Sequence, residues 1–208
     1  MSVYTAHDEW LEPTKAAIAA GKVICLPTDT VYGVGANAFS ADAVTALLEA
    51  KSRTRQKPPP VLVASIEQAQ SLVESVPEAA HKLAEAFWPG ALTIILPAKP
   101  TIGWDLGETN GTVALRMPNH PMALELLTAV GPLAVTSANI TGQPPANTVE
   151  EARAQLGDAV AVYLDAGRGG GGVPSSIVRF NSDTEMELIR AGAIASADLE
   201  RVSGLELA

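Results

Sequence analysis

Four basic side chains lie close together in a chain that is otherwise acidic: Lys51, Arg53, Arg55 and Lys57. The formal net charge of the whole chain is −9. Clustered cations can neutralise a polyphosphate, a substrate for which positioning and charge neutralisation supply most of the catalysis. A solvated basic loop is the simpler interpretation of the cluster alone, because exposed charges interact weakly in water.

A second polar group follows an apolar run and consists of Thr28, Asp29 and Thr30. The run over residues 22–26 is typical of a buried strand and stops at Pro27. In open α/β sheets, ligands bind outside the carboxyl ends of the strands. We therefore expect this group to face the basic cluster across a site for a small anionic substrate.

Two further strand ends carry polar residues. Arg116 ends the apolar phrase that begins at Val113, and a partly buried guanidinium needs an anionic partner. That partner could be a substrate or an internal carboxylate. Ser137 and Asn139 end another short apolar run, where such residues are often turn or cap residues. The glycines at 169–172 could form an anion-binding nest or a mobile lid.

Several classes of enzyme are excluded by the motifs that the chain lacks. It has no P-loop, Gly33-Val34-Gly35 lacks the third glycine of a dinucleotide fingerprint, and Ser137 is not in a Gly-x-Ser-x-Gly elbow. Those glycines are better explained by turning and close backbone approach. No metal ligands are expected, because the three histidines (His7, His81 and His120) lack metal-ligand spacing.

Composition places the chain among ordered globular proteins. Of its 208 residues 47% are hydrophobic and 18% are charged, which favours one well-buried domain. The negative net charge argues against a broad non-specific grip on nucleic acid. Cys25 is expected to be a buried structural thiol. Because no signal pattern or run of ~20 apolar residues is present, we expect no membrane contact and a soluble protein in the reducing cytoplasm.

The positioning elements follow from periodicity and capping residues. Helices are expected over 8–20, from Ser40 to about Lys51, from Ser65, from Pro77 to Trp88, from Pro121 through Leu127 and after Thr148. Strands are expected over 22–26, 61–63, 92–96, 112–116, 132–135 and 160–164, with a closing hairpin of 177–180 and 187–190. Residues 98–111 are expected to form a surface loop, because they contain Pro100 and three glycines.

This alternation predicts a single α/β domain over residues 1–208, with its core at about 8–192 and a short helix and loose tail over 196–208. We expect a twisted mixed sheet flanked by helices, with an open cleft at the strand ends.

Six motifs, taken in order, resemble those of the threonylcarbamoyl-adenylate synthase family, the YrdC-like proteins, in its short single-domain form. The similarity extends from about Gly21 to Gly192. The motifs are Pro27-Thr28-Asp29-Thr30-Val31-Tyr32-Gly33, Lys51-Ser52-Arg53, Trp88-Pro89-Gly90, Arg116-Met117-Pro118, Ser137-Ala138-Asn139 and Pro174-Ser175-Ser176.

The resemblance implies a YrdC-like fold and a reaction in which L-threonine, bicarbonate and ATP, with Mg²⁺, give threonylcarbamoyl-AMP and pyrophosphate. The product would supply tRNA threonylcarbamoyladenosine modification through partner proteins. Direct tRNA contact by this chain stays open.

The family pattern also implies roles for individual residues. Threonine would lie near Thr30, Arg116 and Ser175. ATP or the adenylate would contact Arg53, Lys57, Thr112, Ser137 and Arg190. Lys51 and Asn139, with Arg53 and Ser137, would line the reaction centre as the catalytic set.

Three positions depart from the family pattern. Lys57 stands where some relatives have asparagine, Pro145 replaces a common serine, and Pro174-Ser175-Ser176 replaces Glu-Ser-Thr, so either serine could contact threonine. Two alternatives remain: an RNA-binding module of the same fold, and a carbamoyl-transfer domain related to hydrogenase maturation. Scarce aromatics count against the first, and the short chain without zinc-finger segments counts against the second.

Overall fold

The computed structural model describes residues 1–208 and contains one ten-stranded mixed sheet flanked by seven α-helices. The expected α/β class is confirmed. The strand order is β1-β8-β2-β3-β7-β4-β6-β5-β9-β10. The strands are β1 Ser2–Thr5, β2 Ile24–Leu26, β3 Gly33–Asn37, β4 Val61–Leu62, β5 Leu92–Pro97, β6 Thr112–Arg116, β7 Leu133–Ser137, β8 Val162–Asp165, β9 Ser176–Ser182 and β10 Glu185–Arg190.

The helices cover both faces of the sheet. They are α1 Leu11–Ala19, α2 Ala41–Ala50, α3 Ile66–Ser71, α4 Glu78–Phe87, α5 Pro121–Val130, α6 Val149–Leu156 and α7 Ser196–Ser203, with short 3₁₀ turns at Pro100–Ile102 and Gly157–Ala159. A smaller core cluster packs α1 and α5, and a larger one packs the other five helices. Cys25 is fully buried in this core, and burial raises the pKa of its thiol. None of the helices has the length and hydrophobicity that a membrane span requires.

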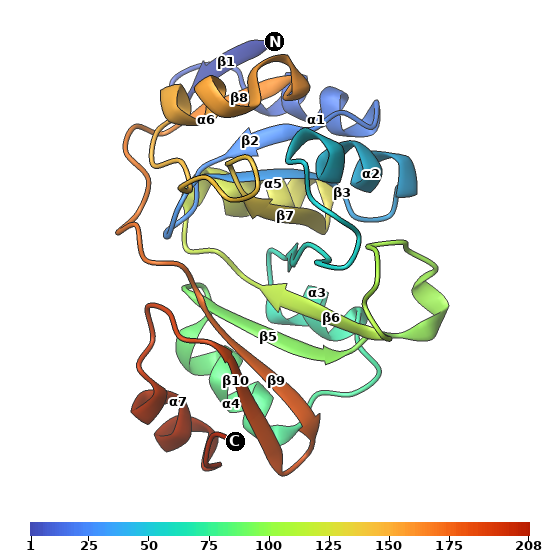
Figure 1. Ribbon diagram of the computed structural model, residues 1–208, viewed down its shortest axis with the longest axis vertical. Coiled ribbons are helices and arrows are strands. Elements are labelled where there is room, and N and C mark those ends of the chain that lie inside the picture. Colours follow the sequence, from blue (N-terminus) through green and yellow to red (C-terminus); the bar gives the residue numbers. More distant parts are fainter.

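The sheet has a narrow waist at β4. This strand has two residues, Val61 and Leu62, and pairs with β7 on one side and β6 on the other. Beyond it the sheet divides into half-sheet A (β1, β8, β2, β3 and β7) and half-sheet B (β6, β5, β9 and β10), which lie apart in Figure 1. The short β4 follows from Pro58, Pro59 and Pro60, because proline cannot donate to a strand ladder. The narrow waist leaves room for a cleft between the two half-sheets.

Local capping fixes several helix starts as expected. The side chains of Ser40, Ser65 and Thr148 each accept a hydrogen bond from a backbone N–H in the first turn of α2, α3 and α6. Pro77 lies at the N-cap of α4, one position before the expected first turn. Lys51 is the C-cap of α2, so the basic cluster begins where that helix ends.

Strand β3 was not expected, because Gly33 and Gly35 are weak strand formers. Their role is close packing against β7. A Cβ built on either glycine would lie 2.7 Å from a methyl group of Val135. The expectation of close backbone approach is therefore confirmed, and the expectation of a turn at these glycines is wrong.

The two chain ends also differ from expectation. Residues before 8 form β1, which pairs in parallel with β8 at the edge of half-sheet A. The tail expected to be loose is attached: Leu207 forms a bridge with Met186, and the Ala208 N–H donates to the Met186 carbonyl at 3.0 Å. Local sequence does not show either contact, because both partners are distant along the chain.

Candidate functional site

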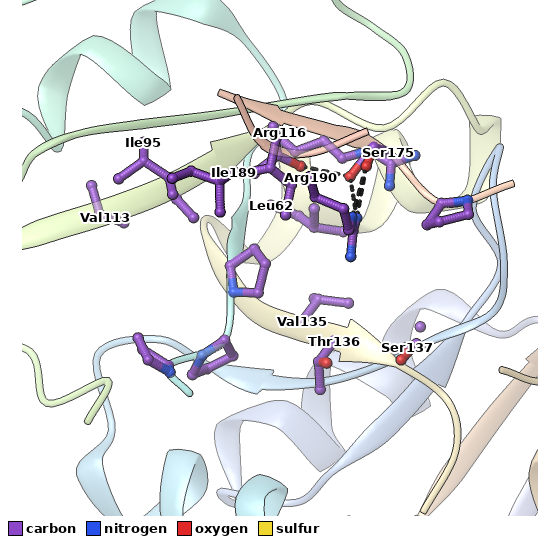
Figure 2. Close-up of a pocket in the computed structure, with 18 of the residues that line it drawn as sticks. Leu62, Ile95, Val113, Arg116, Val135, Thr136, Ser137, Ser175, Ile189 and Arg190 are labelled. Atoms are coloured by element: carbon purple, nitrogen blue, oxygen red, sulfur yellow. Dashed lines mark hydrogen bonds between the residues drawn. The ribbon is translucent and has the colours of Figure 1, made fainter. Parts of the chain in front are cut away.

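A cavity of about 580 Å³ lies between the half-sheets, next to the waist at β4. This volume lies within the range typical of small-molecule sites. Figure 2 shows Thr136 and Ser137 of β7 across the cavity from Arg116 of β6, Arg190 of β10 and Ser175, which directly precedes β9. The structure thus brings together seven of the ten expected site residues: Thr30, Arg53, Thr112, Arg116, Ser137, Ser175 and Arg190.

Arg53 is fixed on the wall that belongs to half-sheet A. Its Nη1 donates to the Thr136 hydroxyl at 2.9 Å, and its Nε donates to the Lys57 carbonyl at 2.6 Å. Burial lowers the pKa of Arg53, although a guanidinium stays charged in proteins. Beside it, the Ser137 hydroxyl lines the cavity. The wall therefore offers a positioned cation next to a hydroxyl group.

Arg116 is held on three sides at the carboxyl end of β6. Its Nε donates to the Gly90 carbonyl at 3.0 Å, Nη1 to the Thr30 hydroxyl at 3.0 Å and Nη2 to the Asp29 carboxylate at 2.7 Å. The internal carboxylate left open by the sequence is thus present, and it is Asp29. Burial lowers the pKa of Arg116, while Asp29 opposes that shift. Two of the five guanidinium N–H groups remain for a ligand.

Arg190 encloses Ser175 at the same end of the cavity. Its Nε and Nη2 donate to the Ser175 carbonyl at 3.0 and 2.8 Å, and Nη2 also donates to the Ser175 hydroxyl at 3.0 Å (Figure 2). That hydroxyl lies 2.8 Å from the Thr93 hydroxyl. Burial, and then the positive charge of Arg116, lower the pKa of Arg190. Arg190 therefore holds this serine while its positive charge lies near that of Arg116, and two neighbouring guanidinium groups favour a bound anion.

The next serine, Ser176, is turned away from the cavity. Its hydroxyl donates to the Ile194 carbonyl at 2.8 Å and accepts from the Ile194 N–H at 3.0 Å. Of the two serines, only Ser175 lines the cavity and could contact a ligand there.

The cavity wall carries an excess of positive charge, although the net charge of the whole chain is negative. Its wall contains four arginine residues (Arg53, Arg116, Arg179 and Arg190) and a single carboxylate, Glu108. Such a concentration of one charge in a cleft attracts anionic ligands even where the net charge of the protein is negative.

Lys51 and Asn139 do not line the cavity, contrary to expectation. The Lys51 ammonium donates to the carbonyls of Ser137 and Asn139. The Asn139 amide donates to the carbonyls of Ile140 and Gln143 at 2.9 and 2.8 Å. In this structure the polar groups of both side chains are therefore bound to the loop that follows Ser137.

Lys57 is exposed and also absent from the cavity wall, where its neighbour Gln56 lies instead. Its backbone carbonyl holds Arg53, so the position supports the site through its main chain. Pro145, which replaces a common serine, does line the cavity. It can offer only apolar contact and a carbonyl there.

Two parts of the site were missed by the sequence. The loop over 98–111 forms part of the cavity wall through Leu106, Glu108, Thr109 and Asn110. Leu106 is 1% exposed, and an apolar residue within a polar loop was the available signal. Arg179 lies on β9 and pairs with Glu187 at 3.5 Å. Its alternation with Ile177, another lining residue, could have placed it on the same face.

The glycine run belongs to a strap, residues 166–175, that joins β8 to β9 along one side of the molecule (Figure 1). The Gly169 N–H donates to the Asn147 carbonyl at 2.7 Å, and the Gly172 N–H donates to the Thr30 carbonyl at 3.2 Å. A Cβ on Gly170 would lie 1.8 Å from the carbonyl oxygen of Asp29. The first half of the run therefore packs on the segment that holds Arg116, whereas residues 171–174 are exposed; a mobile lid stays a prediction.

The donor set does not form a magnesium site. Glu108 is the single carboxylate on the cavity wall, and no group of three or more His, Cys, Asp or Glu side chains could hold a metal ion. Mg²⁺ usually takes few protein carboxylates and keeps substrate phosphates as ligands. Any magnesium here would therefore arrive with a phosphate substrate.

Comparison with known proteins agrees with this geometry. A family model for Sua5, YciO and YrdC proteins, described as "Telomere recombination", matches residues 16–192. A protein of Mycobacterium tuberculosis, named provisionally as a threonylcarbamoyl-AMP synthase, is 50% identical over 92% of this chain and 88% of its own length. The threonylcarbamoyl-AMP synthase of Bacillus subtilis is 39% identical over 96% of this chain and 58% of its own.

A crystal structure of Pyrococcus abyssi Sua5 complexed with L-threonine superposes on all of this chain with a TM-score of 0.92 and 32% identity. The chain spans 62% of the length of that archaeal protein. The family model and the M. tuberculosis relative each match most of the chain. On these grounds the chain belongs to the Sua5/YciO/YrdC family, whose curated relatives include threonylcarbamoyl-AMP synthases.

Proposed function

We propose that this chain is an L-threonylcarbamoyladenylate synthase, a nucleotidyltransferase that converts L-threonine, bicarbonate and ATP into threonylcarbamoyl-AMP and pyrophosphate. The observation that carries the proposal is the proximity of Arg116 to Arg190, which binds Ser175, in a cavity whose archaeal counterpart is in a protein crystallised with L-threonine.

The end of the cavity at Arg116 suits the amino acid. The free N–H groups of Arg116 can bind a carboxylate, and the hydroxyls of Thr30 and Ser175 lie beside them. A small polar pocket of this kind fits a short hydroxy-amino acid better than a long or apolar one. Thr30, Arg116 and Ser175 are therefore assigned to threonine.

The wall at β7 suits the nucleotide. Arg53 and Ser137 present a cation and a hydroxyl to a phosphate, and Thr112 and Arg190 extend the polar wall on half-sheet B. Pro58, Pro59 and Pro60, with Leu106, supply an apolar surface for a base. ATP would lie between these groups with Mg²⁺ on its phosphates. The exposed side chain of Lys57 could reach them only after it turns inward.

The chemistry needs positioning more than a protein nucleophile. The threonine amine and bicarbonate form a carbamate with loss of water, and a carbamate oxygen then attacks the α-phosphorus while pyrophosphate leaves. Both reactants are anions, so bringing them together requires fixed cations and aligned donors. Arg53, Arg116 and Arg190 supply these charges from two sides of one cavity.

Later steps lie outside this chain. The adenylate would pass to partner proteins that modify tRNA, and a weak tRNA contact by this chain is part of the same proposal. The RNA-binding and carbamoyl-transfer alternatives gain no support from relatives that are named as synthases at 50% and 39% identity.

The test is to incubate the purified protein with ATP, Mg²⁺, L-threonine and ¹⁴C-bicarbonate and to measure pyrophosphate and labelled adenylate. Formation of both, dependent on threonine, is expected. Turnover with carbamoyl phosphate in place of threonine would overturn the proposal in favour of carbamoyl transfer, and RNA binding without turnover would favour a binding module.

A further inference from the structure

A chain of hydrogen bonds runs from Arg116 through two threonine hydroxyls to a backbone carbonyl. Arg116 Nη1 donates to Thr30 Oγ1 at 3.0 Å, and Thr30 Oγ1 lies 3.0 Å from Thr28 Oγ1. Thr28 Oγ1 donates to the Val31 carbonyl at 2.6 Å. All three side chains are buried, with 3 to 8% of each residue exposed.

The direction of this chain is fixed by counting protons. A hydroxyl has one proton to donate and two lone pairs to accept with. The Thr28 proton is taken by the Val31 carbonyl, which can only accept. Its lone pairs then receive the Thr30 N–H at 3.2 Å and the Thr30 hydroxyl proton. Thr28 is saturated, and Thr30 must be the donor in the contact between the two hydroxyls.

One bonding position remains on the Thr30 hydroxyl. Its proton points to Thr28, and one of its lone pairs receives the Arg116 N–H. Because Thr30 lines the cavity, the second lone pair is left for a ligand. A group that binds there must itself donate an N–H or O–H, so a carboxylate or phosphate oxygen is excluded from this position.

We propose that Thr28 is a positioning residue that turns the Thr30 proton away from the cavity, and that Thr30 accepts a hydrogen bond from the α-amino group of the amino acid substrate. This inference rests on the proposed function. Arg116 binds the carboxylate, and the amino group is on the adjacent carbon, close to the hydroxyl that shares the same guanidinium. The side-chain hydroxyl of the substrate is one carbon further away.

The contact would persist through the reaction. When the amine becomes a carbamate, one N–H remains on the nitrogen, so Thr30 keeps its donor. A hydroxyl with its proton pointing into the cavity would instead place a donor against the N–H donors of the ammonium group, which repels it. The saturated Thr28 therefore selects ligands that present a donor beside a carboxylate, which is the chemical class of α-amino acids.

Thr28→Val tests this arrangement, because valine has a similar shape and no hydroxyl. Freed from its acceptor, the Thr30 proton can turn toward the ligand. We expect KM for threonine to rise roughly tenfold, since a hydrogen bond to a charged group is lost, with KM for ATP little changed. Thr28→Ser keeps the hydroxyl and is expected to restore the wild-type KM. Equal KM values for threonine in the wild type and Thr28→Val would overturn the proposal.

Two analogues identify the donor. L-2-aminobutyrate keeps the amine and lacks the hydroxyl, and 3-hydroxybutyrate keeps the hydroxyl and lacks the amine. If the amine is the donor, Thr28→Val weakens binding of L-2-aminobutyrate as much as binding of threonine and leaves 3-hydroxybutyrate unaffected. The reverse pattern would show that the hydroxyl is the donor and overturn this assignment.

Calorimetry on the wild type keeps the test independent of turnover and of the folding of the variant. The wild type should bind L-2-aminobutyrate more tightly than 3-hydroxybutyrate, and equal affinities would contradict the inference. A wild type that binds threonine with this preference yet makes no adenylate would refute the proposed function alone.

Discussion

The Lys51 ammonium lies 2.5 Å from the carbonyl oxygen of Asn139 and 3.4 Å from its side-chain oxygen, although 88 positions separate the two residues. The same ammonium also holds the Ser137 carbonyl. Lys51 is 1% exposed, so these carbonyls replace the water that a charged amine normally has.

This arrangement predicts a pH dependence. Burial, and then the charge of Arg53, lower the pKa of Lys51 to about 8. Below that pH the ammonium has three N–H donors, and above it the neutral amine has two. Dividing kcat/KM of the wild type by that of Lys51→Met cancels the titration of the substrate amine. We expect this ratio to fall as pH rises through about 8, and a flat ratio would contradict the role of the charge.

The free energy of unfolding should change in the opposite direction. Because the folded pKa of about 8 lies below the ordinary lysine value of 10.5, the unfolded chain binds more protons between these two values. The wild type should therefore gain stability relative to Lys51→Met as pH rises through this window, by at most about 3 kcal/mol. Urea unfolding at about pH 7.5, below this window, and at about pH 9.5, within it, measures the change in the free energy of unfolding.

The ion pair of Arg116 with Asp29 predicts a coupled loss. Arg116→Ala should raise KM for threonine more than KM for ATP. It should also destabilise the fold by about 2 kcal/mol, because it leaves the partly buried Asp29 carboxylate with the Asn119 N–H, at 2.9 Å, but without its cation. The double variant Asp29→Ala/Arg116→Ala should recover part of that stability and none of the threonine affinity. Denaturant unfolding and steady-state kinetics measure the two effects, and an equal rise of both KM values would contradict the assignment.

The strap offers a matched pair of glycines. Gly170→Ala would place a Cβ 1.8 Å from the carbonyl oxygen of Asp29, whereas a Cβ on Gly171 meets nothing within 4 Å. Neither glycine has a positive φ, so the difference is steric. We expect Gly170→Ala to raise KM for threonine about tenfold or to lower Tm by several degrees, and Gly171→Ala to do neither. Equal behaviour of the two variants would show that the strap does not press on Asp29.

The close approach of β3 and β7 predicts a size exchange. Gly33→Ala should be destabilising because its Cβ would lie 2.7 Å from a Val135 methyl. Val135→Ala removes that methyl and leaves space. The double variant should be more stable than the sum of the single effects predicts, with a coupling energy of about 0.5–3 kcal/mol. Thermal or urea unfolding of the wild type, the two single variants and the double variant measures this coupling. Strictly additive changes in the free energy of unfolding would refute the contact.

Features that depend on local sequence could be predicted. The caps at Ser40, Ser65 and Thr148 bond within their own first turns. Short apolar runs predict the strands that end at Arg116 and Ser137 and the strand that precedes Thr30. Because strand ends converge in an α/β sheet, those residues could be placed at one site from the sequence.

Features that depend on contacts between residues far apart in the sequence could not be predicted. The sequence does not show that Asp29 is the partner of Arg116, or that Lys51 turns from the cavity toward two carbonyls. The sequence also gives no sign of β3, because the glycines in this strand are explained only by their packing against Val135 on β7. In each case the deciding atom belongs to a segment about 90 positions away or more.

The strand order has a consequence for the synthesis of the chain. Strand β8 lies between β1 and β2, so half-sheet A stays incomplete until a late segment has been made. Half-sheet B likewise waits for β9 to pair with β5. Neither half can close on the ribosome before most of the chain has emerged. Because such non-local pairings form slowly, apolar strand edges are exposed meanwhile, and nascent chains of this fold should depend on protection from aggregation until β9 and β10 dock.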